Sequence, residues 1–310
     1  MPKGTLNIMT TEMHLLESAP FGRVIPAMVT PMKADGTVDY EAAQVLAKHL
    51  VEDGADGILL NGTTGESPTT HLEEKIDLVR AVKEVVEVPI LTGAGSNDTA
   101  HSVRMAEHIQ EAGADALLIV APYYSRPSQE GIYQHYKAVN DSSDVPVVIY
   151  DVPGRTGVRI STETYVRLAG LSQVKAVKDA TGDLAAAVVK KMETGLAWYS
   201  GDDGVYLPFL SIGAVGIISV IAHVASGPLR DLTNAFNEGH ILEAQRIAVQ
   251  LAPLVGALNG DGFQAVMAKA ACHVQGYMDS TAMRLPNVGP HQAQLEKARE
   301  GMRAAGVLKA

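Results

Sequence analysis

Short apolar runs recur along the 310-residue chain, and segments with helical periodicity lie between them. The runs are nearly continuous in Val, Ile, Leu and Ala, as expected for parallel strands that are covered on both faces. The intervening segments are long enough to cross back over a sheet as helices. The pattern predicts about eight βα units, with strands at 24–29, 58–60, 90–92, 116–120, 147–150, 174–178, 198–200 and 215–220.

Local signals support the same repeat. Residues 52–60 resemble residues 111–119, and both stretches have the order of a helix end, a glycine stop and a strand. Helix starts are indicated at three points, namely Thr70 with Glu73 in capping-box spacing, Ser128, and Asp183.

Eight βα units predict an α/β fold of the (β/α)8 TIM-barrel type. An open, doubly wound sheet is the alternative, but residues 26–31 read Pro-Ala-Met-Val-Thr-Pro where that fold carries Gly-x-Gly-x-x-Gly. After residue 220 only helices are expected, at 229–236, 241–258, 266–274 and 291–305. We therefore expect a flexible leader at 1–20, a barrel at 21–237 and a helical extension packed on it at 238–310.

Composition excludes several classes of protein. The net charge is −10, and no block of five or six basic residues offers a nucleic-acid surface. The most apolar stretch, 214–225, contains Ser219 and His223 and is shorter than the ~18 residues of a membrane-spanning helix. A single cysteine, Cys272, permits no intramolecular disulfide, and the first twenty residues lack the apolar run of a signal peptide. We expect a cytoplasmic protein. Histidine spacing predicts no metal site.

Side-chain alternation places one lysine at the catalytic end of a strand. In residues 174–178, Lys178 shares a face with Ala176 and Val174 and points into the barrel if the strand begins at Val174. Burial would lower the pKa of such an amine from ~10.4 toward the range in which it attacks a carbonyl. A lysine that merely pairs with Asp179 at the strand end is the alternative.

The neighbouring strand offers a proton carrier. Tyr150 shares a face with Val148, so the fifth and sixth strands are expected to present Tyr150 and Lys178 side by side. A phenol close to an amine can shuttle protons during imine formation. A buried tyrosine that bonds a backbone carbonyl remains the alternative.

Loops after other strands carry further polar groups. Residues 61–67, Asn-Gly-Thr-Thr-Gly-Glu-Ser, offer hydroxyls and backbone N–H groups to an anion such as a carboxylate, or form no more than a turn. Arg155 follows Tyr150 and can clamp a carboxylate with its planar guanidinium, or remain a solvated loop residue. Tyr123 and Tyr124 follow the fourth strand.

Six motifs occur in order at the expected strand ends: Gly62-Thr-Thr-Gly-Glu-Ser67, Pro122-Tyr-Tyr124, Tyr150-Asp-Val-Pro-Gly-Arg-Thr156, Val177-Lys-Asp-Ala-Thr-Gly182, Ser200-Gly-Asp-Asp203 and Gly216-Ile-Ile-Ser-Val220. Together they resemble the pyruvate-dependent class I aldolases, from about Gly22 to Leu308. Within that family they are similar to the synthases that condense pyruvate with aspartate 4-semialdehyde in lysine and diaminopimelate biosynthesis. The resemblance implies a lyase that acts through a lysine Schiff base and needs no external cofactor.

The resemblance also implies catalytic roles. Lys178 matches the Schiff-base lysine, and Tyr150 matches the proton donor and acceptor. Thr63 and Tyr124 match the hydroxyls that complete a proton relay, and the family's equivalent of Tyr124 reaches in from a neighbouring subunit. A tight dimer, usually doubled to a tetramer, is therefore expected.

Substrate contacts are implied in the same way. Thr64 and Ile218 match positions that hold pyruvate, and Gly201 lies in the adjoining turn. Arg155 matches the arginine that binds the carboxylate of the second substrate.

An effector pocket is only partly present. Ser67, Asn97 and Tyr123 match residues that line the lysine-binding pocket of feedback-sensitive members. Leu72 and Lys75 stand where that pocket carries histidines, and His101 stands where it carries a glutamate. We therefore expect weak or absent inhibition by lysine.

Two other functions remain open. A sister aldolase that acts on a sugar acid or another 2-oxo acid would share Lys178 and Tyr150, whereas such relatives generally lack Arg155. A catalytically idle paralogue could serve as a small-molecule sensor or scaffold, but it would not need the complete set of relay residues.

Overall fold

The computed structural model describes residues 19–260 and 262–309. Of the leader predicted at 1–20, residues 1–18 therefore lie outside the described part of the chain. The strands are β1 (Val24–Pro26), β2 (Ile58–Leu60), β3 (Ile90–Gly93), β4 (Ala116–Val120), β5 (Val147–Asp151), β6 (Val174–Asp179), β7 (Ala197–Ser200) and β8 (Gly216–Ser219). All eight predicted strands are present.

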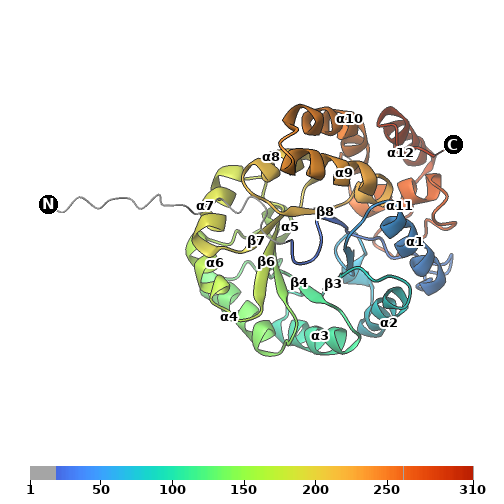
Figure 1. Cartoon of the computed structure of the whole chain (residues 1–310). Helices are drawn as coiled ribbons and strands as arrows, with labels where there is room; N and C mark the ends of the chain where they lie inside the picture. The colour runs from blue at the N-terminus through green and yellow to red at the C-terminus, as the bar shows by residue number, and fades with distance from the viewer. Residues whose placement is uncertain (1–18, 261, 310) are drawn as a thin grey trace.

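Helices alternate with the strands and surround them (Figure 1). They are α1 (Tyr40–Glu52), α2 (Leu72–Lys83), α3 (Thr99–Glu111), α4 (Gln129–Asp141), α5 (Pro153–Thr156), α6 (Thr162–Ala169), α7 (Leu184–Thr194), α8 (Tyr206–Ser211), α9 (Ala222–Asn237), α10 (Ile241–Asn259), α11 (Gln264–Val274) and α12 (Gln292–Ala304). Two short 3-10 turns are η1 (Ser67–Thr69) and η2 (Asp203–Val205).

The sheet closes into a barrel. Its strands pair in parallel in the order β1-β8-β7-β6-β5-β4-β3-β2. The first and last strands of that order also meet, since Ala27 and Leu59 form a parallel bridge and the Met28 backbone N–H donates to the Leu59 carbonyl at 2.9 Å. The predicted TIM barrel is confirmed, and the open sheet is excluded.

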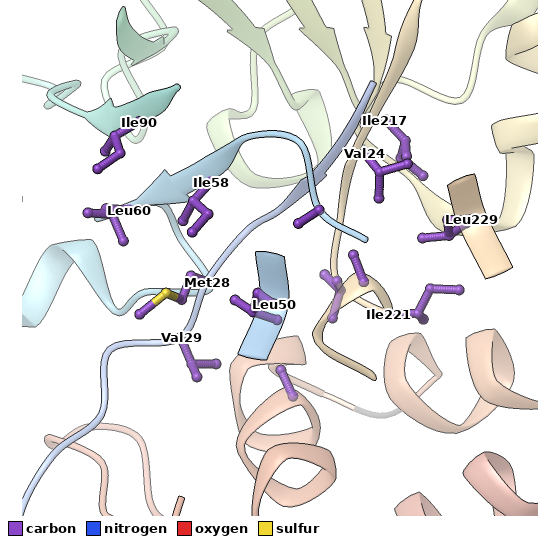
Figure 2. Packing of buried hydrophobic residues seen from close by; sticks show 14 of the residues in the cluster. Val24, Met28, Val29, Leu50, Ile58, Leu60, Ile90, Ile217, Ile221 and Leu229 are labelled. Atoms are coloured by element: carbon purple, nitrogen blue, oxygen red, sulfur yellow. The ribbon is translucent and has the colours of Figure 1, made fainter. Parts of the chain in front are cut away.

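The apolar core has two layers. The barrel interior contains residues that alternate along the strands, among them Ile25, Leu91 and Val148. A larger cluster fills the space between the strands and the surrounding helices. Figure 2 shows Val24 and Ile58 of this outer layer near Leu50 of α1. Strands buried on both faces explain why the runs read as continuous rather than alternating.

Two local predictions were wrong. Val174 packs in the outer cluster instead of sharing the inner face with Ala176. The pairing of β5 with β6 is irregular at Val147 and Val148, and this shift changes the alternation before Ala176. Helix α2 is capped one residue later than predicted, because the His71 backbone N–H donates to the Glu74 side chain at 2.8 Å.

Helix caps at Ser128 and Asp183 are confirmed. The Ser128 hydroxyl accepts a hydrogen bond from the Gly131 backbone N–H, and the Asp183 carboxylate accepts one from Ala186. These caps satisfy backbone groups in the first turns of α4 and α7.

The C-terminal helices α10, α11 and α12 pack against one another and on α9. Helix α10 is apolar and long enough to span a membrane by length and composition alone. It buries Ala244, Ile247, Leu251 and Leu254 against its neighbours, whereas Leu242 and Val249 on its other side are exposed.

Candidate active site

Lys178 and Tyr150 lie side by side at the ends of two adjacent strands. They are register partners in the pairing of β5 with β6, and both side chains are buried. The Lys178 Nζ lies 4.6 Å from the centre of the Tyr150 ring. The arrangement follows from strand alternation, because Val148 and Ala176 precede them on the inner face.

The environment of Lys178 favours a neutral amine. Burial lowers its pKa to about 7, and the nearby Arg155 guanidinium acts in the same direction. The Asp203 carboxylate partly opposes this by favouring the charged form. A substantial fraction of the amine is therefore nucleophilic near neutral pH.

The Tyr150 hydroxyl interacts with a neighbouring threonine. Burial raises the pKa of the phenol, whereas Arg155 and a side-chain hydrogen bond with Thr63 lower it. Thr63 and Tyr150 both line the cavity that lies at this end of the barrel.

Asp179 does not pair with Lys178. Its carboxylate accepts hydrogen bonds from the Trp198 indole at 3.0 Å and from the Thr181 backbone at 2.8 Å. The carboxylate that acts on Lys178 is Asp203 of η2, to which the sequence analysis gave no role. The Gly-Asp-Asp turn after β7 was the available signal.

A cavity of about 540 Å³ is lined by Tyr150 and Thr63. Lys178 is not among the described residues that line it. Among residues 19–260 and 262–309, four basic side chains line the cavity, namely His71, Lys75, His101 and Arg155. The other titratable lining groups in those ranges are two tyrosines, Tyr123 and Tyr150. In the same ranges, no three His, Cys, Asp or Glu side chains lie close enough together to hold a metal ion. The cavity is therefore suited to anionic organic molecules.

Arg155 stands at the wall of the cavity. Its Nη2 donates to the Gln264 Oε1 at 3.1 Å, and its Cζ lies 5.8 Å from the centre of the Phe263 ring. The side chain is exposed, so the guanidinium is accessible to a carboxylate.

The remaining predicted substrate-binding residues, Thr64, Ile218 and Gly201, lie near the strand ends. Ile218 lies in the interior cluster with Tyr150, and Thr64 is also buried. Gly201 donates its backbone N–H to the Asp179 carbonyl at 2.7 Å, and an added Cβ would lie 3.0 Å from that oxygen. None of these three residues lines the cavity itself.

Residues from the C-terminal part of the chain hold the loop that carries Thr63 and Thr64. Glu66 adopts a left-handed conformation with φ 59°, and its carboxylate meets the Lys269 Nζ at 2.6 Å. Both side chains are fully buried. The second Glu66 oxygen accepts from the Arg284 backbone N–H at 3.1 Å. The sequence analysis did not detect this ion pair, whose members are 203 residues apart.

Tyr124 points away from this site. It is 90% exposed, has φ 72°, and does not line the cavity. Its neighbour Tyr123 does line it. Within one chain, the structure therefore brings together Lys178, Tyr150 and Thr63 but not Tyr124.

Most of the predicted effector residues line the same cavity, and we call the part that they line the outer cavity. Ser67 and Tyr123 line it, as do Leu72 and Lys75, whereas Asn97 does not. His101 of α3 also lines this cavity.

Lys75 is held by the protein itself. Its Nζ donates to the Ser67 carbonyl at 2.8 Å and to the Thr70 carbonyl at 2.7 Å, and it also contacts the Thr70 hydroxyl. Burial lowers its pKa to about 8, so most of the amine is charged at neutral pH. The outer cavity thus contains a resident ammonium group.

Comparison with known proteins identifies the family of this chain. Residues 20–305 match the model of the Dihydrodipicolinate synthetase family. A protein of Bifidobacterium longum (strain DJO10A), named 4-hydroxy-tetrahydrodipicolinate synthase, is 71% identical over 96% of this chain and 99% of its own length. One of the same name from Corynebacterium diphtheriae is 52% identical over 93% of this chain and 96% of its own.

Solved structures share the fold at lower identity. A dihydrodipicolinate synthase from Bacillus anthracis has a TM-score of 0.88 and 38% identity, covering 91% of this chain and 98% of its own. The enzyme from Cyanidioschyzon merolae, solved with lysine bound, has a TM-score of 0.89 and 37% identity, with 93% and 99% covered. This chain belongs to the dihydrodipicolinate synthetase family.

Proposed function

We propose that the chain condenses pyruvate with L-aspartate 4-semialdehyde to give 4-hydroxy-tetrahydrodipicolinate and water, in lysine and diaminopimelate biosynthesis. The observation that carries the proposal is the buried Lys178 amine with its pKa near 7, set against Tyr150 at a cavity whose charged groups are cationic. Both substrates carry a carboxylate and a carbonyl group. Relatives at 71% and 52% identity bear the name of this activity.

The first half of the reaction builds a carbon nucleophile. The neutral Lys178 amine attacks the ketone carbon of pyruvate, and the carbinolamine loses water to form an imine. Tyr150, bonded to Thr63, transfers the protons that this step requires. Loss of a proton from the methyl carbon then gives an enamine, with the imine nitrogen as the electron sink.

The second half releases the lysine. The enamine carbon attacks the aldehyde of aspartate semialdehyde, whose carboxylate is held by Arg155. The amine of the adduct then attacks the imine carbon and displaces Lys178, which closes the ring. Water from the first imine is the second product, so the atoms balance without an external cofactor.

We extend the proposal to assembly and location. The exposed Tyr124, held at a positive φ, supports a dimer in which each chain supplies this tyrosine to its partner's relay, with a tetramer as the expected final assembly. The single cysteine, Cys272, is buried and free, which supports a cytoplasmic location.

Covalent trapping tests the proposed chemistry directly. Borohydride reduction of the protein with pyruvate should add the reduced pyruvyl group to a single tryptic peptide at Lys178, as read by mass spectrometry. Addition of aspartate semialdehyde should produce the condensation product and compete with trapping. Modification of another lysine, or none, would contradict the assignment.

Arg155→Ala separates this function from that of a sister aldolase. We expect the KM for aspartate semialdehyde to rise roughly 30-fold or more, because a charge-assisted contact with its carboxylate is lost. Pyruvate trapping should remain close to that of the unchanged protein. Arg159→Ala is the matched control, since Arg159 is an exposed arginine of the same loop that pairs with Asp183. Equal loss of both substrates would favour a different role for Arg155.

Lysine should inhibit turnover weakly or not at all. The outer cavity offers the effector's ammonium no carboxylate among its described lining residues, and Lys75 already occupies the local oxygen acceptors with its own ammonium group. We expect less than a twofold change in rate at millimolar lysine. Calorimetry beside the Cyanidioschyzon merolae enzyme, whose structure holds lysine, supplies the control. Strong inhibition would show that the pocket was assigned incorrectly.

A further inference from the structure

A line of side-chain hydrogen bonds runs from Arg155 to Asp203 along the C-terminal helices. The Arg155 Nη2 donates to the Gln264 Oε1 at 3.1 Å, and the Gln264 Nε2 donates to the Asn259 Oδ1 at 3.2 Å. The Asn259 Nδ2 in turn donates to the Asp203 Oδ2 at 2.9 Å. The two amide residues close α10 and open α11. We call these four side chains the amide relay.

Every link of the amide relay has the same polarity. In both Gln264 and Asn259 the amide N–H group donates on the side of Asp203, and the amide oxygen accepts on the side of Arg155. Aligned hydrogen bonds between a cation and an anion polarise one another, so each bond strengthens the next. Neither amide can be inverted without placing two donors or two acceptors in contact.

The Asp203 carboxylate is held in place by further hydrogen bonds. Its other oxygen accepts from the Ser219 hydroxyl at 2.5 Å, and the backbone N–H groups of Val220 and Ile221 lie 3.2 Å from Oδ2. The carboxylate is buried, whereas Arg155 at the far end is exposed. Movement is therefore expected at the arginine end.

The charges at both ends of the amide relay also influence the pKa of the reactive amine. The groups that act on Lys178 are the Asp203 carboxylate from η2 and the Arg155 guanidinium from α5, with the Tyr150 ring alongside from β5. The carboxylate of Asp179, the next residue on β6, accepts a hydrogen bond from the Trp198 indole instead. Displacement of either end of the relay changes the field at the Lys178 nitrogen.

We propose that Gln264 and Asn259 are positioning residues for the second substrate. They hold the Arg155 guanidinium at the cavity wall in the orientation that receives a carboxylate, and they join that arginine to the Asp203 carboxylate, which acts on Lys178. This inference rests on the proposed function for its substrate, but not for its geometry.

Substitutions along the line test the proposal. Gln264→Leu and Asn259→Leu should each raise the KM for aspartate semialdehyde about three- to tenfold and leave the KM for pyruvate within twofold. Gln264→Glu should raise it further, because its carboxylate competes with the substrate for Arg155. Gln292→Leu is the control, since the Gln292 side chain donates to the exposed Glu296 side chain of the same helix at 3.0 Å.

Coupling distinguishes a relay from two separate residues. The double variant with both leucines should be no worse than either single variant, because one broken link already interrupts the line. In an Arg155→Ala background, Gln264→Leu should have no further effect. Additive losses, or single variants within twofold of the unchanged protein, would overturn the proposal.

The pH profile of pyruvate trapping gives a readout that does not need the second substrate. Release of Arg155, or removal of a donor from Asp203, should shift the profile of imine formation toward higher pH in both leucine variants. If the unchanged protein forms the imine yet does not condense aspartate semialdehyde, the proposed function fails while this shift still supports the amide relay. Unshifted profiles would contradict the relay itself, whatever the second substrate is.

Discussion

Lys178→Met is expected to abolish both imine formation and turnover. Methionine fills a similar volume but has no nucleophile, so kcat should fall roughly 10⁴-fold or more. In the unchanged protein, trapping with pyruvate should rise with pH through about 7, because the neutral amine attacks and burial lowers the pKa of Lys178 to about 7. Rates across pH 5.5–9 provide the measurement.

Lys175→Met is the matched control for this substitution. Lys175 lies on the same strand but is exposed on the outside, so its loss should leave trapping and turnover unchanged. Residual turnover in Lys178→Met above one part in a thousand would point to a different nucleophile.

Lys178→Met should also stabilise the fold. The folded pKa of Lys178 is lower than its unfolded value of 10.5, so the unfolded chain binds more protons between about pH 7 and 10.5. The charged amine therefore costs stability fully below pH 7, and the cost disappears as pH rises above 10.5. Lys178→Met removes this cost and should raise the free energy of unfolding by at most roughly 5 kcal/mol. The gain is reduced by the attraction between the Lys178 ammonium and the Asp203 carboxylate, which the substitution also removes. Urea unfolding at pH 6 and pH 10 should show a larger gain at pH 6.

Lys269→Met is expected to cause the largest loss of stability. It leaves the fully buried Glu66 carboxylate without its cation, which should cost about 3–5 kcal/mol in the free energy of unfolding. Because Glu66 belongs to the loop of Thr63 and Thr64, the KM for pyruvate should rise in the protein that still folds. Urea unfolding and steady-state kinetics measure the two effects.

Two further variants define the cause. Glu66→Leu combined with Lys269→Met should recover much of the lost stability, since a well-packed apolar pair replaces buried charges at little cost. Lys137→Met removes an exposed ion pair with Asp141 and should change stability by less than about 0.5 kcal/mol. A loss in Lys269→Met no larger than in this control would mean that the buried pair contributes nothing.

Much of the fold and part of the candidate site could be predicted because they depend on local periodicity. Apolar runs identify the strands, and alternation within 147–151 and 176–179 brings Tyr150 and Lys178 to one face. The prediction failed at Val174, where an irregular pairing alters the alternation. No pattern in one strand reveals such a shift in its neighbour.

The groups that surround the amine could not be predicted in this way. Asn259 meets Asp203 across 56 positions of sequence, and Gln264 meets Arg155 across 109. Neither pair has a fixed spacing, and an amide at a helix end has many ordinary uses. Their partnership arises only when the barrel closes and the last helices pack on it.

The Glu66–Lys269 pair also bears on how this family can diversify. Recombination of two related genes at a crossover between these positions would join a catalytic loop from one parent to terminal helices from the other. A chimera whose parents carry differently sized or differently charged partners here would inherit a buried carboxylate without its counterpart. Crossovers are therefore expected to survive mainly where residues 61–70 and 264–284 come from the same parent.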